Sequence, residues 1–103
     1  MILEVATLTV RSGHNADFEA AFSIAEQIIA ASPGYIDHRL QRCIENGQRY
    51  LLLVHWQTLE DHTIGFRGSA PYQKWRALLH HFYDPTPSVE HFSLVSEYTR
   101  KPT

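Results

Sequence analysis

Two runs of strand-forming residues, separated only by Asn46-Gly47, restrict the fold of this chain more than any other feature of the sequence. The runs are YIDHRLQRCIE at 35–45 and QRYLLLVHWQ at 48–57. Asn-Gly is the pair most favoured in a tight two-residue β-turn, because both positions of that turn need a positive φ angle. The centre of the chain is therefore predicted to be an antiparallel hairpin.

The length of this turn sets the register of the hairpin. Counting outward from a two-residue turn puts Leu40 opposite Leu53 and His38 opposite His55. Residues that lie opposite each other in a sheet point to the same face. We therefore expect His38 and His55 to share one face of the sheet.

A strand and an amphipathic helix are predicted before the hairpin. Residues 2–10 are rich in aliphatic and β-branched types, which is typical of a strand. Apolar residues then recur at helical spacing from Phe18 to Ile29, after an expected N-cap at Ser12 or Asn15. The motif SPG ends this helix, because proline cannot continue it and glycine favours the turn that follows.

Two helical segments and a last strand are predicted after the hairpin. Thr58 and Asp61 resemble a capping box that opens a short helix. Ser69 starts a longer helix, with a proline in its first turn, where the missing N–H is harmless. Residues 89–96 form the last predicted strand, and a polar tail begins at about residue 97.

The predicted elements follow the order strand, helix, strand, strand, helix, strand within one domain that spans residues 1–103. This order is that of the ferredoxin-like α+β fold, an antiparallel sheet with its helices on one face. Two helices cover only that face, so the other face would expose an apolar patch. We therefore expect a homodimer that packs sheet against sheet.

Composition and charge exclude several classes of partner. Hydrophobic residues make up 44% of the chain and charged residues 19%, with a net charge of -2, as in an ordinary folded domain. The arginines are scattered, so the chain has no basic patch for nucleic acid or an anionic membrane. The single cysteine, and a start that lacks the features of a signal peptide, favour a cytoplasmic address.

Three histidines are candidates for proton transfer. His38 and His55 share a face in the predicted register, and His62 follows soon after that strand ends. Histidine exchanges protons near neutral pH, so such a group suits a general base or a donor to a developing oxyanion. We expect His62 to face a cavity between the sheet and the helices. The alternative is a set of partly exposed histidines with backbone partners.

Aromatic residues near these histidines would form the walls of a binding pocket. Trp56, Phe66 and Tyr72 suit a flat substrate, and Arg67 would pair with a phenolate or carboxylate. The same aromatic residues would also pack well in a core. The histidines, including His91, match no zinc-ligand spacing, and no nucleotide-binding loop is present. We therefore expect no metal, haem or flavin.

The stretch LLLVHWQTLEDHTIGFRGSAPYQKW resembles the antibiotic biosynthesis monooxygenase domain family. The resemblance rests on an aliphatic strand that ends at Trp56, a following helix with His62, and a helix start from Ser69 to Tyr72. It implies a ferredoxin-like fold of the dimeric α/β barrel type. Some members of the family oxidise phenols or quinols with oxygen and no cofactor, whereas others degrade haem or process small signalling molecules.

Two departures from the family narrow the expected function. The family often has Glu where this chain has His55. Its haem-degrading members have Asn on the first strand, and Trp and His at the positions that match Phe66 and Arg76, and this chain has none of these three residues there. We therefore expect a cofactor-independent monooxygenase that oxidises a small phenol or quinol, or else a non-catalytic dimeric binding domain for a small apolar molecule.

The resemblance and the residue pattern together give a set of expected site residues. His62 and His55 are the expected catalytic residues. The residues expected to bind the substrate are His38, Trp56, Phe66, Arg67 and Tyr72.

Overall fold

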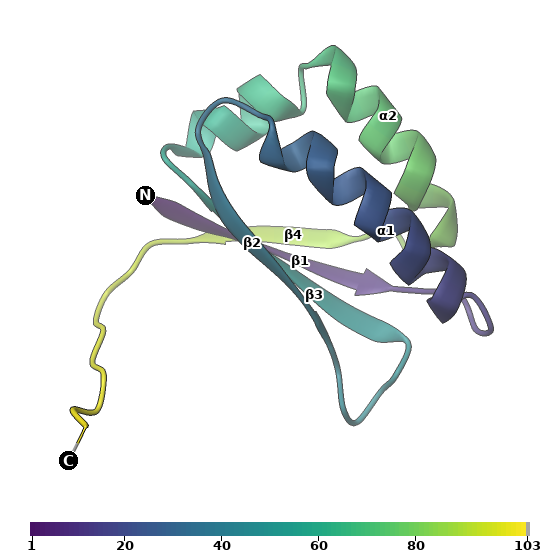
Figure 1. Ribbon diagram of the computed structural model, residues 1–103, viewed down its shortest axis with the longest axis horizontal. Helices are drawn as coiled ribbons and strands as arrows, with labels where there is room; N and C mark the ends of the chain where they lie inside the picture. Colours follow the sequence, from purple (N-terminus) through teal and green to yellow (C-terminus); the bar gives the residue numbers. More distant parts are fainter. Residues whose placement is uncertain (103) are drawn as a thin grey trace.

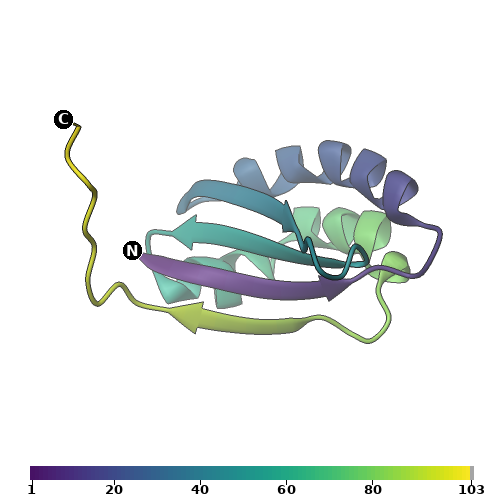
Figure 2. The ribbon, with the colours of Figure 1, turned by 90° about the horizontal axis from the view of Figure 1, so that it is seen from below.

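The computed structural model describes residues 1–102, and these form a four-stranded antiparallel sheet with the strand order β2-β3-β1-β4. In chain order the elements are β1 (Ile2–Thr9), α1 (Asn15–Ala30), β2 (Tyr35–Arg42), β3 (Arg49–Trp56), the short π-helix η1 (Asp61–Phe66), α2 (Ala70–Leu79), the 3-10 turn η2 (His80–Phe82) and β4 (Ser88–Phe92). Both long helices lie on the same face of the sheet (Figures 1 and 2). The ferredoxin-like α+β prediction is confirmed.

The core lies between the helices and one face of the sheet. Alternate residues of the central strands point toward the helices, because successive side chains of a strand alternate between its two faces. The buried residues on this face are Glu4, Ala6 and Leu8 of β1 and Tyr50, Leu52, Val54 and Trp56 of β3. One of these is a carboxylate, which is unusual in a core and indicates a special environment.

The hairpin has a different register from the one that the Asn-Gly pair predicts. Cys43 donates its backbone N–H to the carbonyl oxygen of Arg49 at 2.8 Å, so the loop comprises residues 44–48. His38 lies opposite Val54 instead of His55, a shift of one residue. The expectation that His38 and His55 share a face is therefore wrong.

The side chain of Asn46 explains the wider loop. Its Oδ1 accepts a hydrogen bond from the backbone N–H of Gln48 at 3.1 Å, and its carbonyl oxygen accepts one from Arg49 N–H at 3.0 Å. Asn46 thus forms a local turn of its own, which competes with the two-residue β-turn. An odd number of loop residues then moves every residue of one strand to the opposite face.

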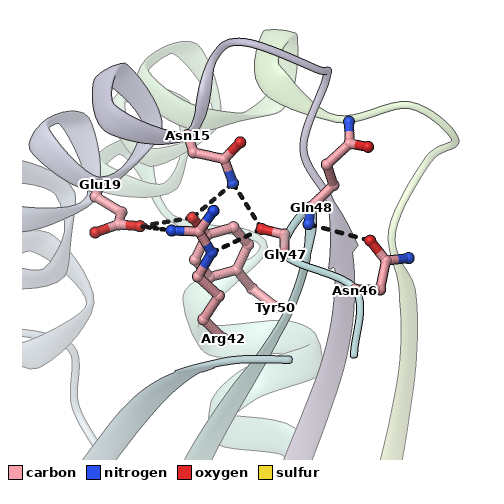
Figure 3. A network of polar contacts seen from close by, with 7 residues as sticks. All are labelled: Asn15, Glu19, Arg42, Asn46, Gly47, Gln48 and Tyr50. Atoms are coloured by element: carbon pink, nitrogen blue, oxygen red, sulfur yellow. Dashed lines mark hydrogen bonds and ion pairs between the residues drawn. The ribbon is translucent and has the colours of Figure 1, made fainter. Parts of the chain in front are cut away.

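The start of α1 is tied to this loop. Neither Ser12 nor Asn15 is the N-cap; His14 holds that position, and no side chain caps the helix there. Asn15 instead donates from Nδ2 to the carbonyl oxygen of Gly47 at 2.8 Å and to the hydroxyl of Tyr50 at 2.9 Å. Figure 3 shows the hydrogen bonds and ion pairs around this loop, which involve Asn15, Glu19, Arg42, Asn46, Gly47, Gln48 and Tyr50.

The caps predicted after the hairpin are confirmed. The backbone N–H of Asp61 donates to Thr58 Oγ1 at 3.2 Å, and Thr58 N–H donates to Asp61 Oδ2 at 3.1 Å. These two bonds are the reciprocal pair of a capping box. Ser69 Oγ accepts from Tyr72 N–H at 3.3 Å and caps α2. The first cap starts the helical turn at residues 59–60 that leads into η1, and the second starts α2.

The second face of the sheet carries no helix. Leu51 and Phe92 on this face are 36% and 50% exposed. The last strand ends at Phe92, earlier than predicted, and the chain continues away from the domain as an extended segment in both views (Figures 1 and 2). Within residues 1–102, no helix is long and apolar enough to span a membrane.

Candidate functional site

A cavity of about 120 Å³ lies between the helix-facing side of the sheet and α2. Its wall is apolar for the most part, with a few polar side chains at defined places. The lining residues are Glu4, Ala6, Leu8, Ile29, Leu52, His62, Phe66, Tyr72, Trp75, His80, Tyr83, Thr86, Pro87 and Val89. Apolar walls with a few polar groups are the usual composition of a small-molecule site.

Glu4 is the acidic group of this cavity and is only 5% exposed. It is in phase with Ala6 and Leu8 on β1, so the pleat of the strand points it toward the helices. Its Oε1 accepts a hydrogen bond from Trp56 Nε1 at 3.0 Å and lies 3.3 Å from His62 Nε2. The carboxyl group is thus buried with an indole and an imidazole as polar neighbours.

His62 is held from three sides and is only 3% exposed. Its ring stacks on Trp56, with ring centroids 5.4 Å apart and an angle of 19° between the planes. Its Nδ1 lies 2.8 Å from His91 Nε2, a hydrogen bond in which one ring donates to the other. His91 is directly opposite Glu4 in the pairing of β1 with β4. Glu4, His62 and His91 therefore form a continuous chain of proton-carrying groups.

Burial shifts the pKa values of this chain of groups toward the neutral forms. Burial raises the pKa of Glu4, against the opposing effects of the Trp56 hydrogen bond and the charge of Arg67. The pKa of His62 is lowered to about 3, mostly by burial and in addition by the charges of Arg67 and His91. His62 is therefore an uncharged imidazole at pH 7, which is the form that can accept a proton.

A second polar group lies farther along β1. The backbone of Tyr83 bridges to Val10, beyond the end of β1, and its ring centroid is 5.7 Å from that of His80. Burial raises the pKa of Tyr83, so its hydroxyl keeps its proton and remains able to donate a hydrogen bond. Burial also lowers the pKa of His80, as does the charge of Arg76.

Three of the residues expected from the sequence line this cavity, namely His62, Phe66 and Tyr72. Trp56 lies behind the cavity wall, where it stacks on His62 and lies 5.8 Å from the ring centroid of Phe66. Arg67 is exposed and affects the site through its charge. The sequence therefore indicated one side of the cavity.

His38 and His55 lie elsewhere, on opposite faces of the sheet. His55 Nδ1 lies 2.7 Å from Asp37 Oδ1 on the face that carries no helix. His38 lies under α1, where its Nδ1 is 2.6 Å from the hydroxyl of Tyr35 and its Nε2 is 2.8 Å from Glu26 Oε1. Neither histidine is among the described residues that line the cavity.

Sequence reasoning missed Glu4, His80 and Tyr83, and considered His91 only as a metal ligand. One signal pointed to Glu4: it is the single charged residue in the strand ILEVATLT, and it alternates in phase with Ala6 and Leu8. No comparable pattern marks His80 and Tyr83. Among residues 1–102, no three His, Cys, Asp or Glu side chains are placed to hold a metal ion.

Comparisons with known proteins agree on one family. The family model described as "Antibiotic biosynthesis monooxygenase" matches residues 1–78. The uncharacterized protein YczJ of Bacillus subtilis is 55% identical over 95 residues, which cover 92% of this chain and 100% of that protein.

Two solved structures show the same architecture. A proposed antibiotic biosynthesis monooxygenase from Bordetella bronchiseptica is 38% identical, with a TM-score of 0.89, over 92% of this chain and 97% of that one. SnoaB from Streptomyces nogalater, described as a cofactor-independent oxygenase, is 18% identical, with a TM-score of 0.81, over 96% of this chain and 97% of that one. At that lower identity, the second likeness concerns the fold alone.

Proposed function

The chain belongs to the antibiotic biosynthesis monooxygenase family, and from this premise we propose that it oxidises a small phenol or quinol with O₂ and without a cofactor. The description of SnoaB as a cofactor-independent oxygenase is consistent with this proposal. The observation that carries it is the chain of Glu4, His62 and His91, whose buried members Glu4 and His62 line an apolar cavity. Such a site removes a proton from a bound hydroxyl while it keeps out bulk water.

The first step of the proposed reaction is removal of the phenolic proton. Both nitrogens of His62 already face protein groups, so Glu4 and His62 act as a pair, with the Glu4 carboxylate as the member nearest the substrate. A carboxyl group with a raised pKa is suited to this exchange, because its affinity for a proton lies closer to neutral pH. His62 passes the proton to His91, which is only half-buried.

The second step transfers electrons to oxygen. The phenolate gives one electron to O₂, and the phenoxyl radical and superoxide recombine to a peroxide on a ring carbon. Loss of water from the peroxide leaves a quinone, so that phenol and O₂ give quinone and water. The protein contributes orientation and a dry site, with Phe66, Tyr72 and Trp75 as walls.

We also propose that the protein is a homodimer with the open sheet faces in contact. The face without helices exposes Leu51 and Phe92 in the monomer. The segment after β4 extends away from its own domain and carries exposed apolar side chains, namely Leu94, Val95 and Tyr98. A second copy would cover both surfaces, which otherwise leave apolar area in water.

Oxygen uptake with a panel of phenols and quinols tests the catalytic proposal. Glu4→Gln keeps an oxygen that can accept the Trp56 hydrogen bond but cannot take a proton, so its uptake rate should fall by about 100-fold or more. Glu45→Gln, in the exposed hairpin loop, is the matched control and should retain the wild-type rate. Wild-type protein that binds these molecules without oxygen uptake would instead be a non-catalytic binding domain.

A further inference from the structure

We propose that the cavity selects a single aromatic ring that carries two oxygen substituents at opposite ends, as in 1,4-dihydroxybenzene. This inference rests on the proposed function only in that it takes the same cavity as the ligand site. It goes further by assigning a size limit and a substitution pattern. The size limit follows from the volume and walls of the cavity, and the substitution pattern follows from the positions of its polar groups.

The volume of the cavity is sufficient for one six-membered aromatic ring. An apolar cavity of about 150 Å³ in another protein accommodates benzene, and pockets for drug-sized molecules measure about 300 to 1,000 Å³. The cavity here, at about 120 Å³, is slightly smaller than the benzene cavity and far smaller than those pockets. A six-membered ring therefore fills it, and a second fused ring has no space.

The walls resist expansion because they belong to the core of the domain. Leu8, Leu52, Ile29 and Trp75 all line the cavity, and all are buried between the sheet and the helices. Interiors of proteins pack like solids, so room for a second ring would require movement of a strand or a helix. On this side the size limit is built into the fold, whereas Thr86 and Pro87, in the segment between η2 and β4, form another part of the wall.

The polar groups of the cavity lie at two separate places along β1. Glu4 and His62 are near the start of the strand, whereas Tyr83 is bridged to Val10 at the far end. Both places nevertheless line the same cavity of about 120 Å³. Between the two places β1 contributes only Ala6 and Leu8 to the wall.

A ring with two opposed hydroxyl groups matches this arrangement. One hydroxyl meets the Glu4 and His62 pair, and the other meets Tyr83 and His80. A ring with a single hydroxyl leaves either the buried Glu4 and His62 pair or the buried Tyr83 without a ligand partner. Such a mismatch weakens binding, because a buried polar group without a hydrogen bond loses the energy of its hydration.

Calorimetric titration without oxygen measures this selection directly. We expect 1,4-dihydroxybenzene to bind about tenfold more tightly than phenol, which corresponds to one additional hydrogen bond. Its 1,2 and 1,3 isomers should bind no better than phenol. The two-ring compound 1,4-dihydroxynaphthalene should give no measurable binding. Equal affinity for the one-ring and two-ring compounds, or for the three isomers, would overturn the inference.

Two variants separate the substitution pattern from the size limit. Tyr83→Phe removes one hydroxyl and keeps the ring and His80, so the preference for 1,4-dihydroxybenzene over phenol should fall well below tenfold. Leu52→Ala enlarges the cavity and should admit the two-ring compound; Leu52→Val is a milder substitute if the alanine variant does not fold. If the affinities for 1,4-dihydroxybenzene and phenol still differ tenfold in Tyr83→Phe, Tyr83 does not contact the second oxygen and the proposed pose is wrong.

Binding without oxygen and oxygen uptake fail in different ways. Selective binding of the one-ring compound without oxygen uptake would leave this inference intact and contradict the oxygenase proposal. Oxygen uptake with two-ring phenols would support the oxygenase proposal and contradict the size limit.

Discussion

At the scale of single residues, the burial of His62 makes stability depend on pH in a predictable direction. The folded protein accepts a proton on His62 only near pH 3, whereas the unfolded chain accepts it near 6.5. Protons are therefore taken up on unfolding, and the free energy of unfolding falls as the pH falls from 6.5 toward 3. His62→Gln, which cannot take up this proton, should lose less stability over the same interval. Urea unfolding at a series of pH values measures the difference.

Glu4 acts in the opposite sense to His62. Because its folded pKa is raised from 4.5, Glu4 favours folding at low pH, and this contribution is lost as the pH rises through the folded pKa. The charge of Arg67 lowers the pKa of both groups, and the charge of His91 lowers that of His62. His81→Gln removes a histidine that is exposed, and it should leave the wild-type pH dependence unchanged. Identical pH profiles for wild type and His62→Gln would contradict the buried, neutral state of His62.

The residue scale also shows what the sequence could predict of the site. His62 was identifiable because it follows a strand end in a capped helix, and this position aims it at the open end of the sheet. Glu4 was harder to identify. Alternation shows that Glu4 shares a face of the strand with Ala6 and Leu8, but it does not show which face is buried. The pairing of β1 with β3, which puts Glu4 opposite Val54, depends on contacts between distant parts of the chain.

At the scale of elements, two glycines with similar φ angles should differ in how much stability they lose when each is replaced by alanine. Gly34 and Gly13 have φ angles of 81° and 82°, which disfavour any residue with a Cβ atom. A Cβ on Gly34 would in addition overlap the side chain of Asp61 in the capping box, whereas one on Gly13 meets nothing. Gly13→Ala should cost about 1 kcal/mol of unfolding free energy, and Gly34→Ala at least about 2 kcal/mol.

Gly65 is a control within a helical segment. A Cβ on Gly65 would make an ordinary contact with the carbonyl oxygen of Glu60 at 3.6 Å, and the residue lies inside η1. Gly65→Ala should therefore leave stability unchanged or raise it by up to about 1 kcal/mol. Denaturant unfolding of the three variants gives the comparison. A cost for Gly34→Ala no greater than that for Gly13→Ala would mean that the capping box yields without loss.

The elements themselves were predictable to different degrees, for physical reasons. The order of strands and helices, and the caps at Thr58 and Ser69, depend on local periodicity and hydrogen bonds, which are visible in sequence. The hairpin register was not predictable, because the Asn46 side chain and the bonds of Asn15 to the loop select a wider turn. These bonds join residues that only the folded sheet brings together.

At the scale of the whole molecule, the proposed dimer depends on the open face of the sheet. Leu51 lies between Thr7 of β1 and Gln41 of β2, on the face that the helices do not cover. It is partly solvated in the monomer, so a charge at this position should not disturb the core. In a sheet-to-sheet dimer the same charge would be buried without a partner, which is costly.

Leu51→Glu should therefore dissociate the dimer while the domain stays folded. We expect the wild-type protein to sediment as a dimer at micromolar concentration and Leu51→Glu to sediment as a monomer with an unchanged circular dichroism spectrum. Ile64→Glu, at a position that is 69% exposed on η1, introduces the same charge away from the sheet and should remain dimeric. The melting temperature of the wild type should also rise with protein concentration, because association stabilises the folded state by mass action. Wild-type protein that sediments as a monomer, with a melting temperature independent of concentration, would show that the open face is covered in some other way or stays exposed.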